Sequence, residues 1–319
     1  MTDPESPTGW PRPPLVCPGC RREGLSWRLG PDLDCANPAC GARYPWLTPG
    51  IPAVAAQGVR ERLAESDAPG PLPLQGGLQP MLAAVAPASP AFGPLARAAI
   101  FLRALRADGE EPFYGELCEA LLPDLGPAAA VADLGCGAGN LAFEIARRAP
   151  ANVAGIDLDA HLLRWAERAA GGEEFEAPVR IDAGRFAASP MRVRPGMPGS
   201  RLSFAAANVL DPPFEPGSFD LVTLVNVLDA VPYPAVALRQ AVALLKPGGL
   251  VLFASPDSWN GGTTPPKRWL ATTEAGWDRV FTREGLETLR RIDDLEWRLR
   301  DTPRLHHLYR VHGRLLQKR

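Results

Sequence analysis

The chain has 319 residues, a length that suits one α/β domain of ordinary size and one small additional unit. Apolar residues make up 46% of it and the formal net charge is −2, which excludes a wholly disordered protein and gives no global basic field for nucleic acid. The sequence has no run of 18 apolar residues and no basic, apolar N-terminal segment. We therefore expect a cytoplasmic protein without a membrane partner.

The chain divides by composition into four segments. Residues 1–16 are acidic and bear several prolines, which predicts a flexible leader. Residues 17–56 contain four cysteines and form a candidate small domain. Residues 57–93 are rich in Pro, Gly and Ala, and this composition is typical of a linker. Residues 94–319 form the main domain.

The four cysteines of residues 17–56 lie in two short pairs. The pattern is CPGC, fourteen residues, then CANPAC. Two such turns can bring four thiolates around one tetrahedral, structural Zn²⁺, although four unrelated thiols remain the alternative. The segment after them, with its YP and GIP, resembles the end of small zinc-ribbon proteins that activate RNA and protein methyltransferases. The predicted zinc ligands are Cys17, Cys20, Cys35 and Cys40.

From residue 94 the apolar pattern alternates between helical and strand periods. Helices are predicted over 95–105, 113–122, 139–148, 161–169 and 233–245. Strands are predicted over 129–134, 152–156, 201–207, 219–225, 250–254, 295–300 and 306–316. Because no helix fits between the last two strands, we expect them to pair antiparallel. The expected fold class is α/β: a doubly wound, mostly parallel seven-stranded sheet with an antiparallel C-terminal hairpin, preceded by a small zinc ribbon.

A glycine-rich turn joins the first of these strands to the next helix. Residues 133–140 read DLGCGAGN, and glycines allow a backbone to turn tightly and to approach a ligand closely. A dinucleotide fingerprint would place glycine at Asn140, so NAD is disfavoured. The spacing resembles the acidic-x-Gly-x-Gly-x-Gly motif of class I methyltransferases. That resemblance implies that the loop holds the methionine part of S-adenosylmethionine and that Asp133 interacts with its amino end.

Positions after the second and third strands fit the same cofactor. Asp157 ends the second strand, where a carboxylate can accept hydrogen bonds from both ribose hydroxyls. Asn208 stands where the family has an acid for the adenine amino group, and its amide oxygen can accept the same bond. The predicted cofactor-binding residues are Asp133, Gly135, Cys136, Gly137, Gly139, Asp157, Leu158, Asn208, Val209 and Asn226.

No specific catalytic motif follows the fourth strand. Residues 226–229 read NVLD, in place of the Asn/Asp-Pro-Pro-Tyr/Phe of many enzymes that methylate planar nitrogens. Ligands bind outside the carboxyl ends of strands in this fold, and Asn226 and Asp229 are therefore catalytic candidates. His306, one of three histidines on the last strand, is a candidate base.

Four features resemble the methyltransferase domain of the ovothiol pathway, which methylates a mercaptohistidine. They are the insertion 171–200, the NVLD of 226–229, the SPDSW of 255–259 and the RDTPR of 300–304. The resemblance implies a small acceptor that bears an amine or an imidazole. It also implies that Arg300 or Arg304 pairs with a substrate carboxylate. The predicted substrate residues are Trp259, Arg300 and Arg304.

Two other functions remain open. An RNA methyltransferase could use the zinc ribbon to bind its substrate, and residues 264–319 carry 13 Lys/Arg against 8 Asp/Glu. A non-catalytic, cofactor-binding scaffold could activate a partner, but the intact glycine loop disfavours it. The sequence leaves the oligomeric state open.

Overall fold

The structure is a computed structural model and describes most of the main domain and part of the N-terminal unit. In the main domain it describes residues 94–106, 111–172, 174–182, 185–198 and 200–319. In the N-terminal unit it describes residues 16–17, 20, 25–26, 32–35, 37, 39–48 and 51–52. Residues 1–15 of the predicted leader and the predicted linker 57–93 lie outside the described residues.

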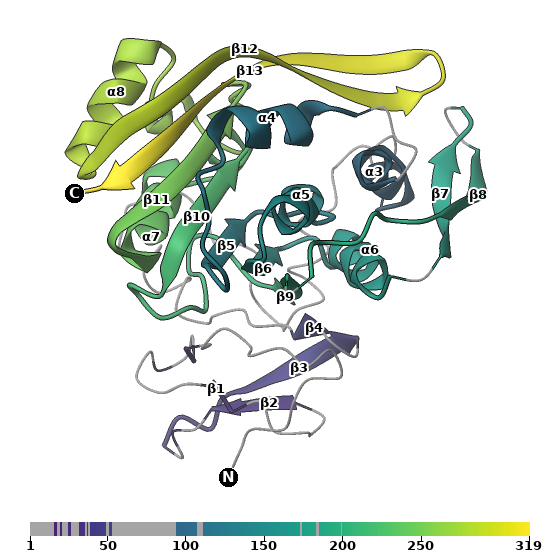
Figure 1. The fold of residues 1–319 in the computed structure, drawn as a ribbon, viewed down its shortest axis with the longest axis horizontal. Coiled ribbons are helices and arrows are strands. Elements are labelled where there is room, and N and C mark those ends of the chain that lie inside the picture. The colour runs from purple at the N-terminus through teal and green to yellow at the C-terminus, as the bar shows by residue number, and fades with distance from the viewer. Residues whose placement is uncertain are drawn as a thin grey trace.

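A seven-stranded sheet forms the centre of the main domain (Figure 1). Its order is β12-β13-β11-β10-β5-β6-β9. The strands are β5 (Ala130–Leu134), β6 (Asn152–Asp157), β9 (Arg201–Ala206), β10 (Phe219–Val225), β11 (Leu245–Ser255), β12 (Leu286–Thr302) and β13 (Leu305–Lys318). The strands from β9 to β11 run parallel, while β13 is antiparallel to both β11 and β12. The predicted sheet and its C-terminal hairpin are confirmed.

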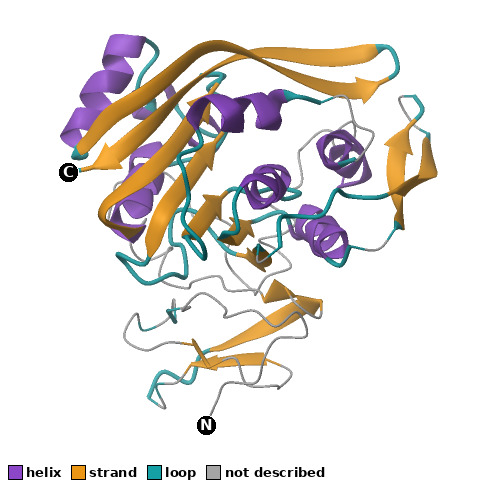
Figure 2. Ribbon diagram, in the orientation of Figure 1, coloured by secondary structure: helices purple, strands orange, loops and turns teal. Residues whose placement is uncertain are grey.

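Helices cover both faces of the sheet (Figure 2). On one face Leu141, Leu163 and Leu221 belong to one buried apolar cluster, and on the other Leu238 and Phe253 belong to a second. The first face carries α3 (Pro94–Phe101), α4 (Phe113–Leu121), α5 (Asn140–Arg148) and α6 (Ala160–Ala170); the second carries α7 (Pro234–Leu244) and α8 (Glu274–Arg283). None of the described helices combines the length and apolarity that crossing a bilayer requires.

Three features of the main domain differ from the sequence prediction. Helix α8 was not predicted, although Thr273 caps it and its apolar residues recur at helical spacing. The insertion 171–200 contains an unpredicted hairpin of β7 (Phe175–Arg180) and β8 (Phe186–Met191). Strand β12 begins at Leu286, well before the predicted start at residue 295. The prediction started too late because an irregularity between Ile292 and Leu295 breaks the alternation of side chains along the strand.

The N-terminal unit packs against the main domain below β6 and β9 (Figure 1). Its sheet contains β1 (Leu25–Ser26), β2 (Asp32–Cys35), β3 (Arg43–Thr48) and β4 (Ile51–Pro52). The backbone N–H of Val16 donates to the carbonyl of Pro213 at 3.0 Å. Cys17 and Tyr44 are buried in the same apolar cluster as Phe214. The unit is therefore docked on the main domain.

Candidate active site

The loop between β5 and α5 depends on its glycines. Gly135, Gly137 and Gly139 have φ angles of 79°, 56° and 81°, a region that favours glycine. A Cβ atom on Gly135 would lie 2.5 Å from Cγ2 of Val227, and one on Gly139 would lie 2.9 Å from Cζ of Phe204. The loop thus fits closely between neighbouring strand ends, with its backbone at the carboxyl edge of the sheet.

Asp157 is fixed at the end of β6 by this loop. One carboxylate oxygen accepts a hydrogen bond from the N–H of Gly137 at 2.8 Å, and the other accepts one from the N–H of Asp159 at 2.7 Å. Burial raises the pKa of the Asp157 carboxyl, which the two backbone donors oppose. Each oxygen keeps a further lone pair, so the carboxylate can still accept two hydroxyl groups.

Two residues beside the loop have buried polar atoms without hydrogen-bond partners. Asp133 is only 3% exposed; its Oδ1 accepts from the hydroxyl of Thr223 at 2.6 Å, and its Oδ2 has no partner. Burial raises the pKa of Asp133 to about 6. Asn226 follows β10 with a φ of 57°, and both polar atoms of its amide are buried without partners. Because such atoms cost about 1–3 kcal/mol each, they are positions where a ligand would supply the missing bonds.

The remaining predicted cofactor residues lie at neighbouring strand ends. The Oδ1 of Asn208 accepts a hydrogen bond from the N–H of Leu210 at 2.9 Å, which leaves one lone pair of that oxygen for another donor. Val209 is buried and Leu158 is half-buried. Cys136 is buried in the apolar cluster of the face that carries α5, and its burial raises the pKa of its thiol well above the ordinary value.

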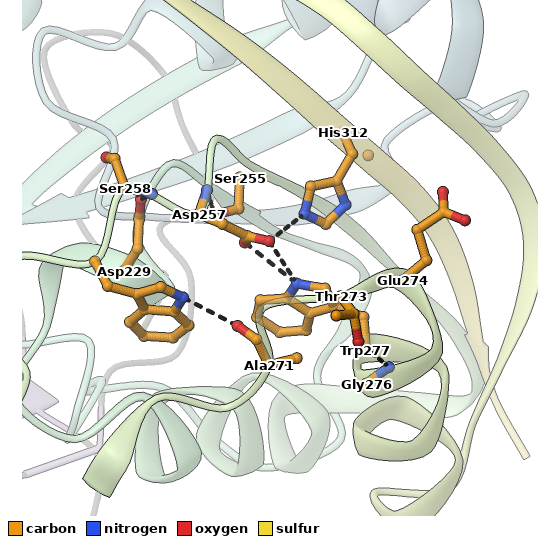
Figure 3. Close-up of polar contacts among 12 residues, drawn as sticks. Asp229, Ser255, Asp257, Ser258, Ala271, Thr273, Glu274, Gly276, Trp277 and His312 are labelled. Carbon is orange, nitrogen blue, oxygen red and sulfur yellow. Dashed lines mark hydrogen bonds and ion pairs between the residues drawn. The ribbon is translucent and has the colours of Figure 1, made fainter. Parts of the chain in front are cut away.

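The loop after β11 carries a group of polar contacts (Figure 3). The buried carboxylate of Asp229 accepts from the N–H of Ser258 at 3.0 Å and from its hydroxyl at 3.1 Å. Burial raises the pKa of Asp229 and these donors oppose the rise. These contacts anchor the loop, and the catalytic role of Asp229 stays a prediction. The Nε1 of Trp259 donates to the carbonyl of Ala271 at 3.0 Å and so fixes the same loop.

Asp257 and His312 form a pair that sequence reasoning missed. The carboxylate of Asp257 accepts from Nε1 of Trp277 at 3.1 Å and lies 3.2 Å from Nε2 of His312 (Figure 3). The register of β13 on β11 places His312 opposite Ser255, at the carboxyl end of the sheet. The predicted base, His306, is exposed near the hairpin turn instead. The sequence showed three histidines on this strand but not the register that distinguishes them.

The two predicted arginines lie at the far end of the hairpin. Arg304 is exposed in the turn between β12 and β13, and Arg300 is half-buried on β12 opposite His306. Between them, Asp301 is buried and accepts a hydrogen bond from Arg180 of β7 at 2.5 Å. No contact among the described residues joins either arginine to the glycine loop. Their role as carboxylate ligands stays a prediction.

The four cysteines converge in the N-terminal unit. All four Sγ atoms lie within 4.8 Å of one another. The distance from Sγ of Cys17 to Sγ of Cys40 is 3.8 Å, and that from Cys20 to Cys35 is 3.7 Å. A tetrahedron with zinc–sulfur bonds of about 2.3 Å has sulfur atoms about 3.8 Å apart. The sulfur positions therefore fit one four-coordinate zinc ion.

The strand order and the glycine-rich loop define the Rossmann-like fold of class I methyltransferases. Residues 132–253 match the family model described as "Methyltransferase domain". This segment extends from β5 into β11 and includes the glycine loop, Asp157, Asn208 and Asn226. The N-terminal unit and the C-terminal hairpin lie outside it.

Curated relatives match a segment of similar length. The ubiquinone biosynthesis O-methyltransferase of Ralstonia nicotianae is 38% identical over 125 residues, which is 39% of this chain and 42% of the relative. That of Albidiferax ferrireducens is 36% identical over 125 residues, or 39% and 40% of the two chains. The match thus spans less than half the length of these relatives. A solved SAM-dependent methyltransferase from Methanosarcina mazei is 20% identical, with a TM-score of 0.43, over 61% of this chain and 94% of that one.

Proposed function

We propose that this chain is an S-adenosylmethionine-dependent methyltransferase whose acceptor is a small molecule bearing an amine or an imidazole. The observation that carries the cofactor assignment is the buried, unpartnered Oδ2 of Asp133 beside a loop that only glycines can form. An acceptor atom at this position suits the ammonium group of the cofactor. The two remaining lone pairs of Asp157, one strand further on, suit its ribose hydroxyls.

The residues of the chain then have distinct tasks in the reaction. When bound, S-adenosylmethionine supplies an electrophilic methyl group on sulfur. Asp133 would hold the ammonium end of the cofactor, Asp157 its ribose, and Asn208 would offer an acceptor for the adenine amino group at the other end. Asn226 presents an amide donor and an acceptor at the end of β10, where they can orient the reacting groups. Alignment of the two reactants is the main contribution that a protein makes to such a transfer.

The shape and charge of the carboxyl edge support a small acceptor. Because His312 lies opposite Ser255, the part of the β12–β13 hairpin beyond this pair extends past the end of β11 and lies above α4 (Figure 1). Exposed arginines of the hairpin are paired with acids: Arg298 with Glu296 at 2.6 Å, and Arg310 with Asp294 at 3.5 Å. In these pairs a carboxylate already occupies the guanidinium that an RNA phosphate would otherwise contact.

Incubation with methyl-labelled cofactor tests this proposal. We expect label to pass from the cofactor into the metabolite fraction of a cell extract and not into its RNA or protein. Label in RNA, with RNA binding that weakens steeply as salt increases, would favour the RNA methyltransferase instead. Tight binding of S-adenosylhomocysteine without transfer to any fraction would favour a cofactor-binding scaffold.

Replacement of Asp157 by alanine is expected to weaken the binding of S-adenosylhomocysteine by about 1.5–3 kcal/mol, because hydrogen bonds to a charged group are lost. Titration calorimetry measures the change. Asp220→Ala is the matched control, since Asp220 bonds the N–H of Ala130 at the start of β5, the opposite edge of the sheet, and should leave the affinity unchanged. Equal affinities in the folded Asp157 variant and the wild type would remove this residue from the site.

The raised pKa of Asp133 predicts a pH dependence of cofactor affinity. With a pKa of about 6, Asp133 is mostly protonated at pH 5 in the free protein, whereas the cofactor ammonium favours the carboxylate. Binding therefore releases a proton, and the affinity for S-adenosylhomocysteine is expected to rise by up to about 10-fold between pH 5 and pH 7. Asp133→Asn should reduce this slope in calorimetric titrations. A slope that stays the same would show that another group causes it.

We further propose that residues 17–56 form a zinc ribbon in which Cys17, Cys20, Cys35 and Cys40 hold one structural zinc ion. The distances between their sulfur atoms support this assignment. Four thiolates occupy all positions of a tetrahedral ion, so the metal would stabilise the unit and take no part in methyl transfer.

A further inference from the structure

A cavity lies between α3, α4, the first turn of α5 and β12. Its empty space is about 230 Å³ when the part open to solvent is included, and its lining residues come from segments that are far apart in the sequence. Asn140, which directly follows the glycine loop, forms one wall. Tyr114 forms another and is close enough to Asp133 to feel its charge. The cavity therefore adjoins the proposed cofactor site and has room for a group about the size of a water molecule, such as an ammonium group.

Aromatic rings form much of the wall of this cavity. Phe101, Phe113, Tyr114 and Trp297 all line it. The ring centroids of Phe113 and Trp297 are 5.5 Å apart, and those of Phe113 and Tyr114 are 5.0 Å apart in an edge-to-face arrangement. The faces of aromatic rings carry partial negative charge and attract cations, most strongly where water is excluded.

The polar groups of the cavity are mainly acceptors. Asn140 is 4% exposed; its side chain bonds the hydroxyl of Tyr114, while its Oδ1 has no hydrogen-bond partner. Glu111 adds a carboxylate to the lining. Among the described residues that line the cavity there is no lysine, arginine or histidine. A ligand that bonds Oδ1 of Asn140 must donate a hydrogen bond, and none of the described lining residues would place a cation against a positive charge on it.

We propose that this cavity binds a positively charged nitrogen group of the methyl acceptor, held by the rings of Phe113 and Trp297, by Oδ1 of Asn140 and by the carboxylate of Glu111. The proposal rests on the methyltransferase function above and specifies its substrate class. The cationic nitrogen is an anchor. The atom that accepts the methyl group is a second, uncharged nucleophile of the same molecule, since a protonated nitrogen has no lone pair with which to attack.

A pair of matched probes tests the cavity. Histamine carries an ammonium group where 4-propylimidazole carries a methyl group, and at pH 8.5 the imidazole of both is uncharged. The full chain, saturated with S-adenosylhomocysteine, is titrated with each probe in a calorimeter. We expect histamine to bind at least about 10-fold more tightly than 4-propylimidazole, because its ammonium group would lie between a carboxylate and aromatic faces. Equal affinities, or no binding of histamine at millimolar concentration, would overturn the proposal.

Variants of Trp297 separate the ring face from general packing. Trp297→Leu is expected to weaken histamine binding by about 5- to 30-fold, whereas Trp297→Phe retains an aromatic face and should lose much less. Glu111→Gln should weaken histamine and leave 4-propylimidazole unchanged. All three variants should bind S-adenosylhomocysteine as the wild type does, which shows that they are folded. Unaltered histamine binding in Trp297→Leu contradicts the proposal.

The two proposals fail in different ways. A chain that binds S-adenosylhomocysteine but does not distinguish the probes would retain the proposed cofactor and lose the cationic acceptor. A chain that does not bind S-adenosylhomocysteine would contradict the proposed function, and the same two probes titrated into the cofactor-free chain would still decide the chemistry of the cavity.

Discussion

Serine in place of Cys17 is expected to release the zinc ion and to unfold the N-terminal unit. Structural zinc sites contribute about 10–16 kcal/mol of apparent binding free energy, and a unit with so few strands has little apolar core to replace it. Elemental analysis of wild-type protein purified without chelator should find one zinc per chain, and the Cys17→Ser and Cys35→Ser variants should have lost it.

A matched control uses another buried thiol. Cys118 lies on α4 in the main domain and is not part of the cysteine cluster, so Cys118→Ser should keep the metal. Limited proteolysis then reports the structural effect, because cleavage of the metal-free variants should begin within residues 17–56. Wild-type protein without zinc, or a Cys17 variant that keeps a full equivalent, would contradict the zinc ribbon.

Replacement of Arg180 by methionine is expected to destabilise the main domain by about 3–5 kcal/mol. Arg180 of β7 and Asp301 of β12 are 2.5 Å apart, and their side chains are only 5% and 4% exposed. Removing the arginine leaves an almost fully buried carboxylate with no guanidinium to balance its charge. Urea unfolding, followed by tryptophan fluorescence, measures the free energy of unfolding.

The double variant separates two contributions to the free energy of unfolding: the loss caused by one unbalanced buried charge, and the net stabilisation by the intact ion pair. Arg180→Met with Asp301→Leu removes both charges, so its stability should lie closer to that of the wild type than the stability of either single variant does. Arg185→Met is a suitable control, because its pair with Asp182 is exposed and should contribute less than about 1 kcal/mol. Additive losses in the double variant would contradict this interpretation.

The cofactor loop was predictable because its signals are local. A strand, three glycines at fixed spacing and a helix follow one another within residues 130–148, and Asp157 ends the next strand. The part of the site that would face the methyl acceptor was not predictable, because it depends on the register between strands that are far apart in the sequence. The sequence gives no sign that Asp229 accepts from Ser258, or that His312 and not His306 lies opposite Ser255.

The cavity was even less predictable from the sequence, because it is built from residues that are far apart in the chain. Phe113, Asn140 and Trp297 belong to two helices and a late strand, and only the return of the hairpin over α4 brings them together. Each of them, viewed singly in the sequence, is an ordinary core residue or a helix-terminal amide. The predicted arginines of the RDTPR segment were placed by resemblance alone, whereas the aspartate between them is the residue whose contacts the structure describes.

The contact of Val16 with Pro213 bears on how the chain assembles as it is synthesised. All four cysteines have been synthesised once the chain reaches residue 40, but Pro213 follows about 170 residues later, or about 10–35 s at ordinary translation rates. The proposed metal site can therefore be filled long before its docking surface exists. During that interval Tyr44 lacks its apolar neighbours from the main domain, such as those in the cluster around Phe214. We expect the supply of zinc during translation to decide whether the N-terminal unit is already folded when the main domain has folded and can bind it.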